Sequence, residues 1–293
     1  MGTGDGSDAA AHGVASRFPA AGGTLYVVAT PLGNLRDVTL RALDVLGSAD
    51  VIAAEDTRVT AALLRHYGIA TRPLSLHEHN EARRAAHIES LLRAGKSVAL
   101  VSDAGTPAVS DPGARLVAAI RSAGLPVVPI PGANAAVAAI SAAGLEAERF
   151  AFLGFLPATP KARRELLATV ARLPLALVIY EAPHRVARTV GLLAETLGGE
   201  REIVVARELT KKFEEYARGT VAELAQKFSD APARGEVVIL ISGAAAEDLS
   251  EEFLGSEVHR LRDAGKSPRD IVEWLISRHG VPRNLAYKLA HES

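Results

Sequence analysis

Acidic and glycine-containing turns follow short apolar segments in the first half of the chain, and these turns carry the residues best suited to chemistry. Asp103 and Gly105 lie in Ser-Asp-Ala-Gly-Thr-Pro, directly after the apolar run 98–101. A carboxylate can accept hydrogen bonds from the hydroxyl or amino groups of a small ligand, and glycine lets the backbone approach it closely. The pattern predicts a small-molecule binding site.

The elements around these turns predict how they are brought together. The run 98–101 is typical of a parallel strand covered on both faces, and similar strands are expected at 24–29, 50–54, 73–76 and 127–130, separated by helical segments. This alternation predicts βαβ units and a mostly parallel sheet, whose strands place their carboxyl ends at one edge. That edge would carry the turns TPLGNL, EDTR, HEHNE, SDAGTP and PGAN.

Further strands are expected at 150–155, 175–180, 202–206 and 236–241, again alternating with helices. Asp111, which follows the turn SDAGTP, is expected to cap a helix that has Pro112 at its first position. The predicted domains are a flexible tail at 1–22, α/β domains at 23–143 and 149–243, and a helix-turn-helix-like extension at 248–293.

Composition narrows the function classes. The 293 residues include no cysteine, which excludes disulfides and thiolate nucleophiles. Their net charge of -1 excludes a global basic field that would attract nucleic acid. No apolar run is long enough to span a bilayer, and a cytoplasmic location is expected. Phosphate-loop, dinucleotide and serine-hydrolase motifs are absent. The turn with His77, Glu78, His79 and Glu81 lacks a convincing ligand pattern, so no metal site is expected.

Seven segments, in this order and at these separations, resemble the tetrapyrrole methylase superfamily, and within it the branch that methylates small-subunit ribosomal RNA. They are TPLGNLRDVTLRAL, AEDTR, SDAGTPAVSDPG, IPGAN, FLGFLP, YEAPHR and RELTKKFEE. The resemblance implies two α/β domains, a mostly parallel N-terminal sheet and a mixed C-terminal sheet, and a small helical extension. It implies an enzyme that uses S-adenosylmethionine to methylate the ribose 2′-hydroxyl of a cytidine in 16S rRNA of the small ribosomal subunit, and a homodimer.

The same resemblance implies roles for particular residues. The cofactor would be held by Pro31, Leu32, Gly33, Asp103, Gly105, Thr106, Gly132, Ala133, Asn134, Leu156, Tyr180 and Gly235. From their positions near the turns, the candidates to hold the RNA backbone are Arg58, Arg185, Arg207, Lys211 and Lys212, with solvated surface side chains as the alternative. Tyr180, Phe155 and Phe213 are the candidates for base stacking.

A general base would help the ribose hydroxyl to react. The first candidates are Glu181, Glu55 and His184, with Asp56, His77 and His79 also open. Glu181 has a structural alternative of equal weight, which is an ion pair with Arg185 four residues on. Two other functions stay open: a tetrapyrrole C-methyltransferase, and a non-catalytic RNA-binding relative.

Overall fold

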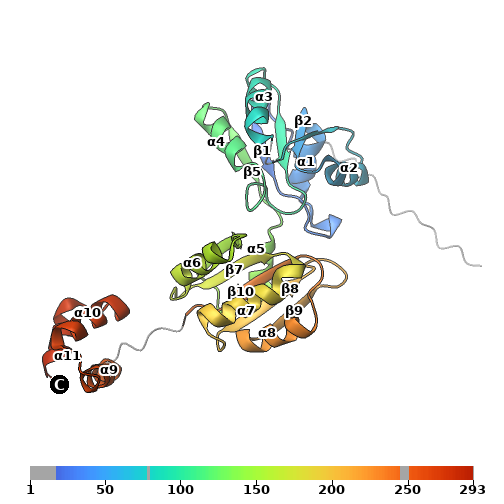
Figure 1. The fold of residues 1–293 in the computed structure, drawn as a ribbon. Coiled ribbons are helices and arrows are strands. Elements are labelled where there is room, and N and C mark those ends of the chain that lie inside the picture. Colours follow the sequence, from blue (N-terminus) through green and yellow to red (C-terminus); the bar gives the residue numbers. More distant parts are fainter. Residues whose placement is uncertain (1–17, 78–79, 245–250, 293) are drawn as a thin grey trace, which may run out of the picture. The chain divides into compact units, whose positions relative to one another are not determined.

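The computed structural model describes residues 18–77, 80–244 and 251–292. By its contacts the chain divides into one unit over Met1–Gly243 and a second over Ala244–Ser293. The described part of the first unit contains two five-stranded sheets, and the second unit is helical (Figure 1).

The first sheet is entirely parallel and has the strand order β3-β2-β4-β1-β5. Its strands are β1 (Leu25–Val28), β2 (Val51–Ala54), β3 (Pro73–Ser75), β4 (Val98–Val101) and β5 (Val127–Ile130). Strand β4 is buried along its whole length because helices cover both faces of the sheet. The predicted parallel sheet is confirmed, and its turns share one edge.

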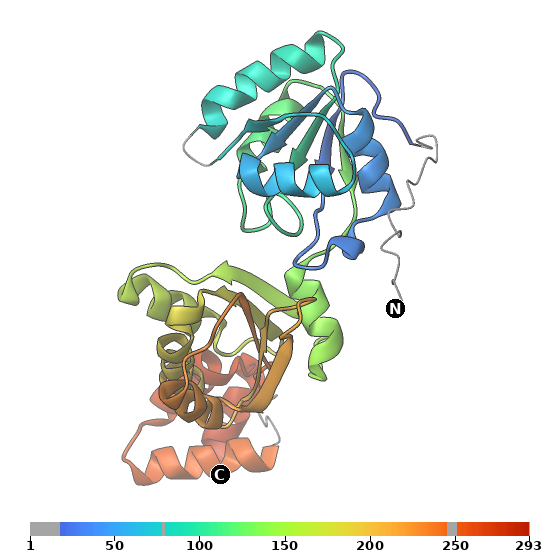
Figure 2. The ribbon, with the colours of Figure 1, turned by 90° about the vertical axis from the view of Figure 1, so that its right-hand side faces the viewer.

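The helices of this sheet form a layer on each face, as Figure 2 shows. Helices α1 (Leu40–Ser48) and α2 (Thr57–His66) pack on one face, and α3 (Glu81–Arg93) and α4 (Ala114–Ser122) pack on the other. A 3₁₀ turn, η1 (Leu35–Asp37), precedes α1. The prediction that Asp111 caps α4 is wrong. The N-cap is Gly113, and the buried carboxylate of Glu81 accepts hydrogen bonds from the amides of Gly113 and Leu116 at 3.1 and 3.0 Å.

The second sheet is mixed, with the order β6-β7-β10-β8-β9. Only the β6–β7 pair is parallel. Its strands are β6 (Phe150–Phe155), β7 (Ala176–Glu181), β8 (Glu202–Arg207), β9 (Glu215–Thr220) and β10 (Val237–Ile241). Strand β9 was missed in the sequence because it is a polar edge strand that pairs only with β8.

Helix α5 (Ala135–Ala143) covers one face of the second sheet, although the sequence places it in the first domain. The other face packs against α6 (Pro160–Val170), α7 (Val186–Leu197) and α8 (Val221–Asp230), with the 3₁₀ turn η2 (Pro183–Arg185) before α7. The chain therefore crosses to the second sheet directly after β5. The predicted domain boundaries stay a prediction.

The second unit contains α9 (Glu251–Asp263), α10 (Pro268–His279) and α11 (Arg283–Glu292), around a core of its own that includes Leu254, Ile271 and Ala286. Ser267 forms a capping box with Asp270 at the start of α10, and Gly280 ends α10 in the left-handed conformation. The three predicted helices are confirmed. Most of the predicted flexible tail, residues 1–17, lies outside the described residues.

Candidate functional site

A cavity of about 410 Å³ lies at the carboxyl-end edge of the first sheet and is closed by residues of the second. This volume is within the range of small-molecule sites. Six of the predicted cofactor residues line it: Leu32, Asp103, Gly105, Thr106, Asn134 and Tyr180. An adjoining cavity of about 390 Å³ shares Leu32 and Asp103 and adds Pro31 and Gly33. The structure thus brings together most of the turns that the sequence singled out.

Hydrogen bonds tie the turns of this edge to one another. The backbones of Thr30 and Gly105 exchange two hydrogen bonds, at 2.8 and 3.0 Å, which joins the turns after β1 and β4. The Thr106 hydroxyl donates to the carbonyl of Ala133 at 3.0 Å, which joins the turns after β4 and β5. The amide of Asp56 donates to Asp103 at 2.9 Å and adds the turn after β2. The cavity wall is therefore preorganised.

Two segments that line the cavity contain non-glycine residues with positive φ. Ala108 and Ser110 have φ of 66° and 63°, and Glu208 and Thr210 have φ of 52° and 65°. Such conformations cost of order 1–3 kcal/mol each and cluster at functional sites. They lie beside Val109 and Leu209, which line the cavity. Backbone strain therefore coincides with the proposed ligand site on both of its sides.

Five acidic residues line the cavity, and three of them, Glu55, Asp103 and Asp111, come from the segments after β2 and β4. Burial, with Asp103 adding its negative charge, raises the pKa of Asp111 from 3.8 to about 6, although a hydrogen bond from Ser102 opposes the rise. Burial first, and then the charges of Asp111 and Asp103, raise the pKa of Glu55. This mutual repulsion makes the cavity electrostatically suited to a cationic ligand. Sequence reasoning assigned Asp111 to a helix cap and missed its place here.

Aromatic residues form the wall on the side of the second sheet. The Tyr180 hydroxyl accepts a hydrogen bond from the amide of Ala136 at 3.0 Å, which holds the start of α5. The rings of Phe152 and Phe155 contact Tyr180 edge-on, with centroids 4.8 and 5.7 Å away. Phe155 is 53% exposed and lines the cavity, so it offers a stacking surface. Phe213 is exposed and lies under the ammonium of Lys212.

Glu181 also lines the cavity, but both of its carboxylate oxygens are engaged. Oε1 lies 3.1 Å from Nε of Arg185 and accepts the amide of Ala182 at 2.9 Å, while Oε2 accepts the hydroxyl of Thr189 at 2.5 Å. The residue is only 2% exposed. The ion pair with Arg185 that the sequence left open is therefore present, and it favours a structural role for this carboxylate.

Of the other candidate bases, Glu55 lines the cavity, whereas His184, Asp56 and His77 do not. His184 is exposed in η2, next to the lining residue Pro183. Asp56 caps α2 and pairs with Arg58 at 2.6 Å. His77 is exposed in the segment after β3, and His79 lies outside the described residues.

Most of the predicted RNA-binding cations have carboxylate partners within the chain. Arg58 pairs with Asp56, Arg185 with Glu181, and Arg207 with Glu215 at 2.5 Å. Lys211 pairs with Glu208 and Glu236 at 3.0 and 3.2 Å. Lys212 lies over the ring of Phe213. Arg58 stays exposed, whereas Arg185, Arg207 and Lys211 are partly buried, and the roles of all five in RNA binding remain predictions.

Four predicted cofactor residues line neither of these two cavities. Leu156 is buried in the core of the second sheet, and the carbonyl of Ala133 accepts the hydrogen bond from Thr106. Gly235, with φ of 76°, packs against Glu208, where a Cβ would lie 2.0 Å from Oε1. A Cβ on Gly132 would lie 2.8 Å from that of Ala29, so glycine is required for the turn after β5 to approach β1.

The described ranges hold neither a metal cluster nor a helix that could cross a membrane. No group of three or more His, Cys, Asp or Glu side chains is arranged there to hold a metal ion. None of the helices in those ranges combines the length and the apolar character that a membrane span requires.

Comparison with known proteins decides the family. Residues 24–225 match the family described as tetrapyrrole (corrin/porphyrin) methylases. The chain belongs to this family. A tetrapyrrole methylase of known structure, uroporphyrin-III C-methyltransferase from Thermus thermophilus complexed with S-adenyl homocysteine, superposes with a TM-score of 0.56. It is 20% identical, the match covers 75% of this chain and 97% of that one, and it shows the shared fold.

Relatives in sequence match almost the whole chain. One is the ribosomal RNA small subunit methyltransferase I of Synechocystis sp., 44% identical over 273 residues, or 92% of this chain and 98% of the relative. Another is the ribosomal RNA small subunit methyltransferase I of Vibrio cholerae, 47% identical over 274 residues, or 92% and 94%. Each of these matches covers 92% of the chain, which is more than residues 24–225 and the segment before them together. The matches therefore extend into the helical unit.

Proposed function

We propose that the protein transfers a methyl group from S-adenosylmethionine to the ribose 2′-hydroxyl of a cytidine in 16S rRNA of the small ribosomal subunit. The observation that carries this proposal is the match over 92% of the chain to relatives named as small-subunit ribosomal RNA methyltransferases. The acidic cavity at the sheet edge supports it, because the cavity suits a cationic cofactor.

The residues present fit this cofactor. Asp103 and Glu55 can accept hydrogen bonds from ribose hydroxyls and an amino group. Backbone groups of the turns around Gly105 and Asn134 can approach the cofactor closely, since Gly105 has φ of 83° and carries no side chain. When bound, the cofactor supplies an electrophilic methyl group on a positively charged sulfonium. The three carboxylates stabilise that charge during binding.

The chain's own contribution to transfer is to position the hydroxyl and to accept its proton. We assign the proton acceptor to Asp111, with Glu55 beside it. Both side chains face the cavity, and a carboxylate with pKa about 6 is ionised at neutral pH yet more basic than an ordinary one. Glu181 is less suitable because each of its oxygens already accepts a hydrogen bond.

The remaining parts of the proposal concern partners. We assign Arg58, Arg207, Lys211 and Lys212 to the RNA backbone, since Arg58 and Lys212 are exposed and Arg207 and Lys211 flank Leu209 at the cavity. We extend the proposal to the assembled small subunit as substrate, to a cytoplasmic location, where ribosomes are, and to a homodimer. Light scattering on the purified protein measures the last of these directly.

The deciding experiment uses small ribosomal subunits from cells that lack this modification. The subunits are incubated with purified protein and labelled S-adenosylmethionine, and the digested RNA is analysed by mass spectrometry. The expected product is labelled 2′-O-methylcytidine. If the protein binds the cofactor in calorimetry but labels no RNA, the proposed RNA substrate is refuted. If the same sample then methylates a tetrapyrrole, the function is C-methylation of a tetrapyrrole instead.

A further inference from the structure

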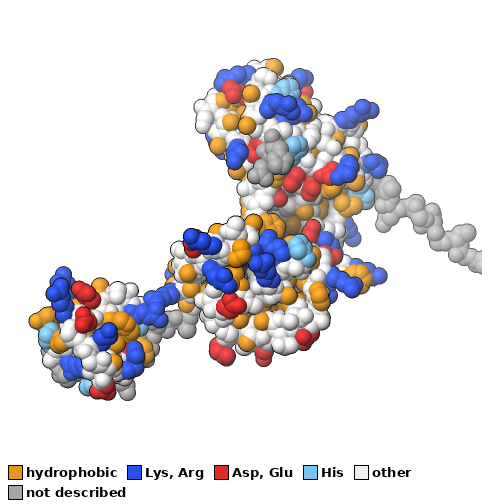
Figure 3. Space-filling view, in the orientation of Figure 1, with side chains coloured by type: hydrophobic (Ala, Val, Ile, Leu, Met, Phe, Trp, Pro, Cys, Tyr) orange, Lys and Arg blue, Asp and Glu red, His pale blue; other side chains and the backbone are white. Residues whose placement is uncertain are grey.

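A third cavity, of about 310 Å³, lies between α6 and α7 and shares no lining residue with the acidic one. Three arginines line it: Arg163 and Arg164 from α6, and Arg188 from α7. The single carboxylate on its wall, Glu195, lies 3.6 Å from Arg164. Figure 3 shows Lys and Arg side chains gathered over these two helices. The cavity therefore has an excess of positive charge.

Arg163 is fixed at the inner end of this cavity. It is 3% exposed, and its Nε and Nη2 donate to the carbonyls of Pro157 and Ala158 at 2.9 and 2.8 Å. Its Nη1 donates to no acceptor among the described residues. Burial, followed by the charges of Arg185 and Arg188, lowers the pKa of Arg163, although the charge of Glu181 opposes this. A buried guanidinium beside two other cations, with one donor group unused, is the environment that an anion would stabilise.

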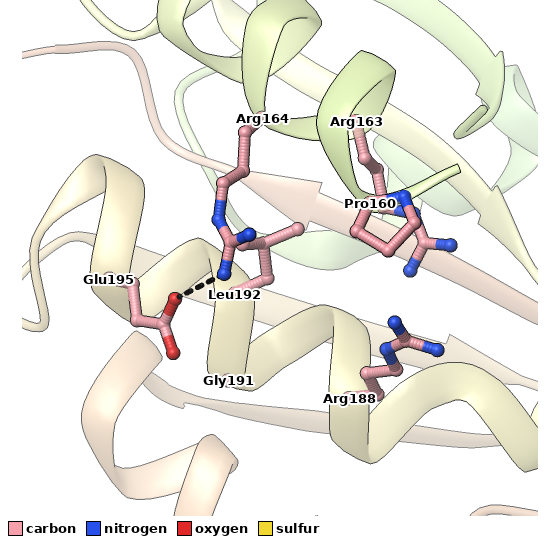
Figure 4. A pocket seen from close by; sticks show the side chains of 7 residues that line it. All are labelled: Pro160, Arg163, Arg164, Arg188, Gly191, Leu192 and Glu195. Carbon is pink, nitrogen blue, oxygen red and sulfur yellow. Dashed lines mark ion pairs between the residues drawn. The ribbon is translucent and has the colours of Figure 1, made fainter. Parts of the chain in front are cut away.

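Arg188 faces Arg163 across the cavity, as Figure 4 shows. No Asp or Glu in the described part of the chain forms an ion pair with Arg188. Gly191, one turn further along α7, leaves the space beside it open, since a Cβ there would meet nothing within 4 Å. Two guanidinium groups that face one another without a carboxylate between them repel, and an anion between them removes that repulsion.

Helix geometry adds to the positive potential. Arg163 lies in the first turn of α6, which begins at Pro160, and Arg188 lies in the first turn of α7, which begins at Val186. Both helix starts carry the positive ends of the helix dipoles, although Thr159 already accepts the amide of Ala162 in α6. The combination of paired guanidinium groups and helix starts is chemically suited to a phosphate group.

The arginine cavity is connected to the acidic one through a short series of interactions. Arg185, whose charge acts on Arg163, pairs with Glu181, and Glu181 lines the acidic cavity. The end of β6 and the segment after β7 contribute Phe155, Ala182 and Pro183 to the acidic cavity, while α6 and α7, which follow these parallel strands, line the arginine cavity. An RNA strand whose reacting nucleotide lies at the acidic cavity would have a cationic site on these helices for one of its backbone phosphates.

We propose that Arg163, Arg164 and Arg188 bind a backbone phosphate of the RNA substrate, next to the nucleotide held in the acidic cavity. This inference rests on the proposed function. It adds a second point of attachment that fixes the direction in which the RNA strand leaves the site. Arg163 and Arg188 hold the phosphate from two helices, and Arg164 supplies a third cation at the rim.

The test uses the full-length protein with Arg188→Ala, Arg188→Lys and the double variant Arg164→Ala/Arg188→Ala. Arg163 is left unchanged because its buried bonds support the fold. Affinity for unmodified small subunits is expected to fall roughly threefold to tenfold in Arg188→Ala and further in the double variant. The slope of log affinity against log salt is expected to fall by about 0.7–0.9 for each phosphate that a variant no longer neutralises. Arg188→Lys retains part of the affinity because it keeps the charge.

Arg65→Ala is the matched control. Arg65 is exposed near the end of α2, and like Arg188 it has no carboxylate partner among the described residues. Its substitution is expected to leave affinity and salt slope unchanged. Calorimetric affinity for S-adenosylmethionine is expected to stay at the wild-type value in every variant, since none of these arginines lines the acidic cavity.

Three outcomes separate the possibilities. Wild-type protein that methylates no ribosomal RNA would overturn the proposed function itself. Wild-type protein that methylates the RNA, with an Arg188→Ala variant of unchanged affinity and salt slope, would overturn this inference alone. A thermal shift caused by inorganic phosphate that Arg188→Ala abolishes, without a change in RNA affinity, would assign the cavity to a free anion and would also overturn it.

Discussion

The backbone amide of Asp56 donates a hydrogen bond to Oδ1 of Asp103 over 2.9 Å. The two residues follow neighbouring strands, β2 and β4, and are 47 residues apart in sequence. This bond holds the Asp103 carboxylate at the boundary of two cavities. It leaves the other oxygen, Oδ2, for a ligand, so we treat Asp103 as the central cofactor-binding carboxylate.

Asp103→Ala is expected to weaken binding of S-adenosylmethionine by at least about tenfold, because a charged hydrogen-bond acceptor is removed. Asp103→Asn keeps an acceptor oxygen for Asp56 and is expected to have an intermediate affinity. Isothermal titration calorimetry measures both, and circular dichroism checks that the fold is intact. Wild-type affinity in Asp103→Ala would show that the cofactor binds elsewhere.

Asp111 is expected to set the acid limb of the pH profile. Its pKa is raised from 3.8 to about 6 by burial, with Asp103 contributing. If its carboxylate accepts the proton, the rate of methyl transfer rises as the pH increases to about 6 and levels off above it. Asp111→Asn is expected to be slow at every pH and to lose this rise. An Asp111→Asn profile with the wild-type shape would exclude Asp111 as the acceptor and favour Glu55.

The same residue is expected to lower stability at neutral pH. Its folded-state pKa lies above the unfolded value, so the folded chain binds more protons between about pH 4 and 6 and stability falls as the pH rises through that window. Asp111→Asn removes this penalty and is expected to raise the free energy of unfolding at pH 7 by about 1 kcal/mol, after allowance for partial exposure. Urea titration at pH 4.5 and 7 measures it, and the difference should shrink at the lower pH.

Glu81 does not line the acidic cavity but holds the start of α4, the helix that follows Asp111. Its buried carboxylate accepts the amides of Gly113 and Leu116, at the start of α4. Glu81→Ala leaves these donors without a partner and is expected to cost about 1–3 kcal/mol. Glu89→Ala on the same helix removes a more exposed ion pair with Arg93 and is expected to cost less than about 1 kcal/mol. Equal losses in urea unfolding would show that Glu81 does not act as the cap.

The helical unit is expected to act in RNA binding. It has its own core and separates from the rest of the chain at Ala244. Deletion of residues 248–293 is expected to leave cofactor affinity unchanged and to weaken binding to small subunits. Filter binding to the subunits and calorimetry with S-adenosylmethionine measure the two effects. Full activity of the truncated protein on small subunits would show that the unit is dispensable for RNA recognition.

Local patterns determined much of this protein from sequence alone. Continuous apolar runs such as 98–101 predict buried parallel strands, and parallel strands must end at one edge, so Asp103, Gly105 and Asn134 could be placed together without coordinates. The ion pair of Glu181 with Arg185 was open to sequence reasoning because its members are only four residues apart in the sequence.

Contacts between distant segments were decided only by the tertiary structure. Glu81 caps α4 from 32 residues away, so the Asp111 side chain is not used as the cap. It lines the cavity instead, where burial raises its pKa. Arg163 and Arg188 meet because two helices follow neighbouring parallel strands. A residue's type and spacing fix its local conformation. Its burial, its pKa and its partners depend on what the rest of the chain places beside it.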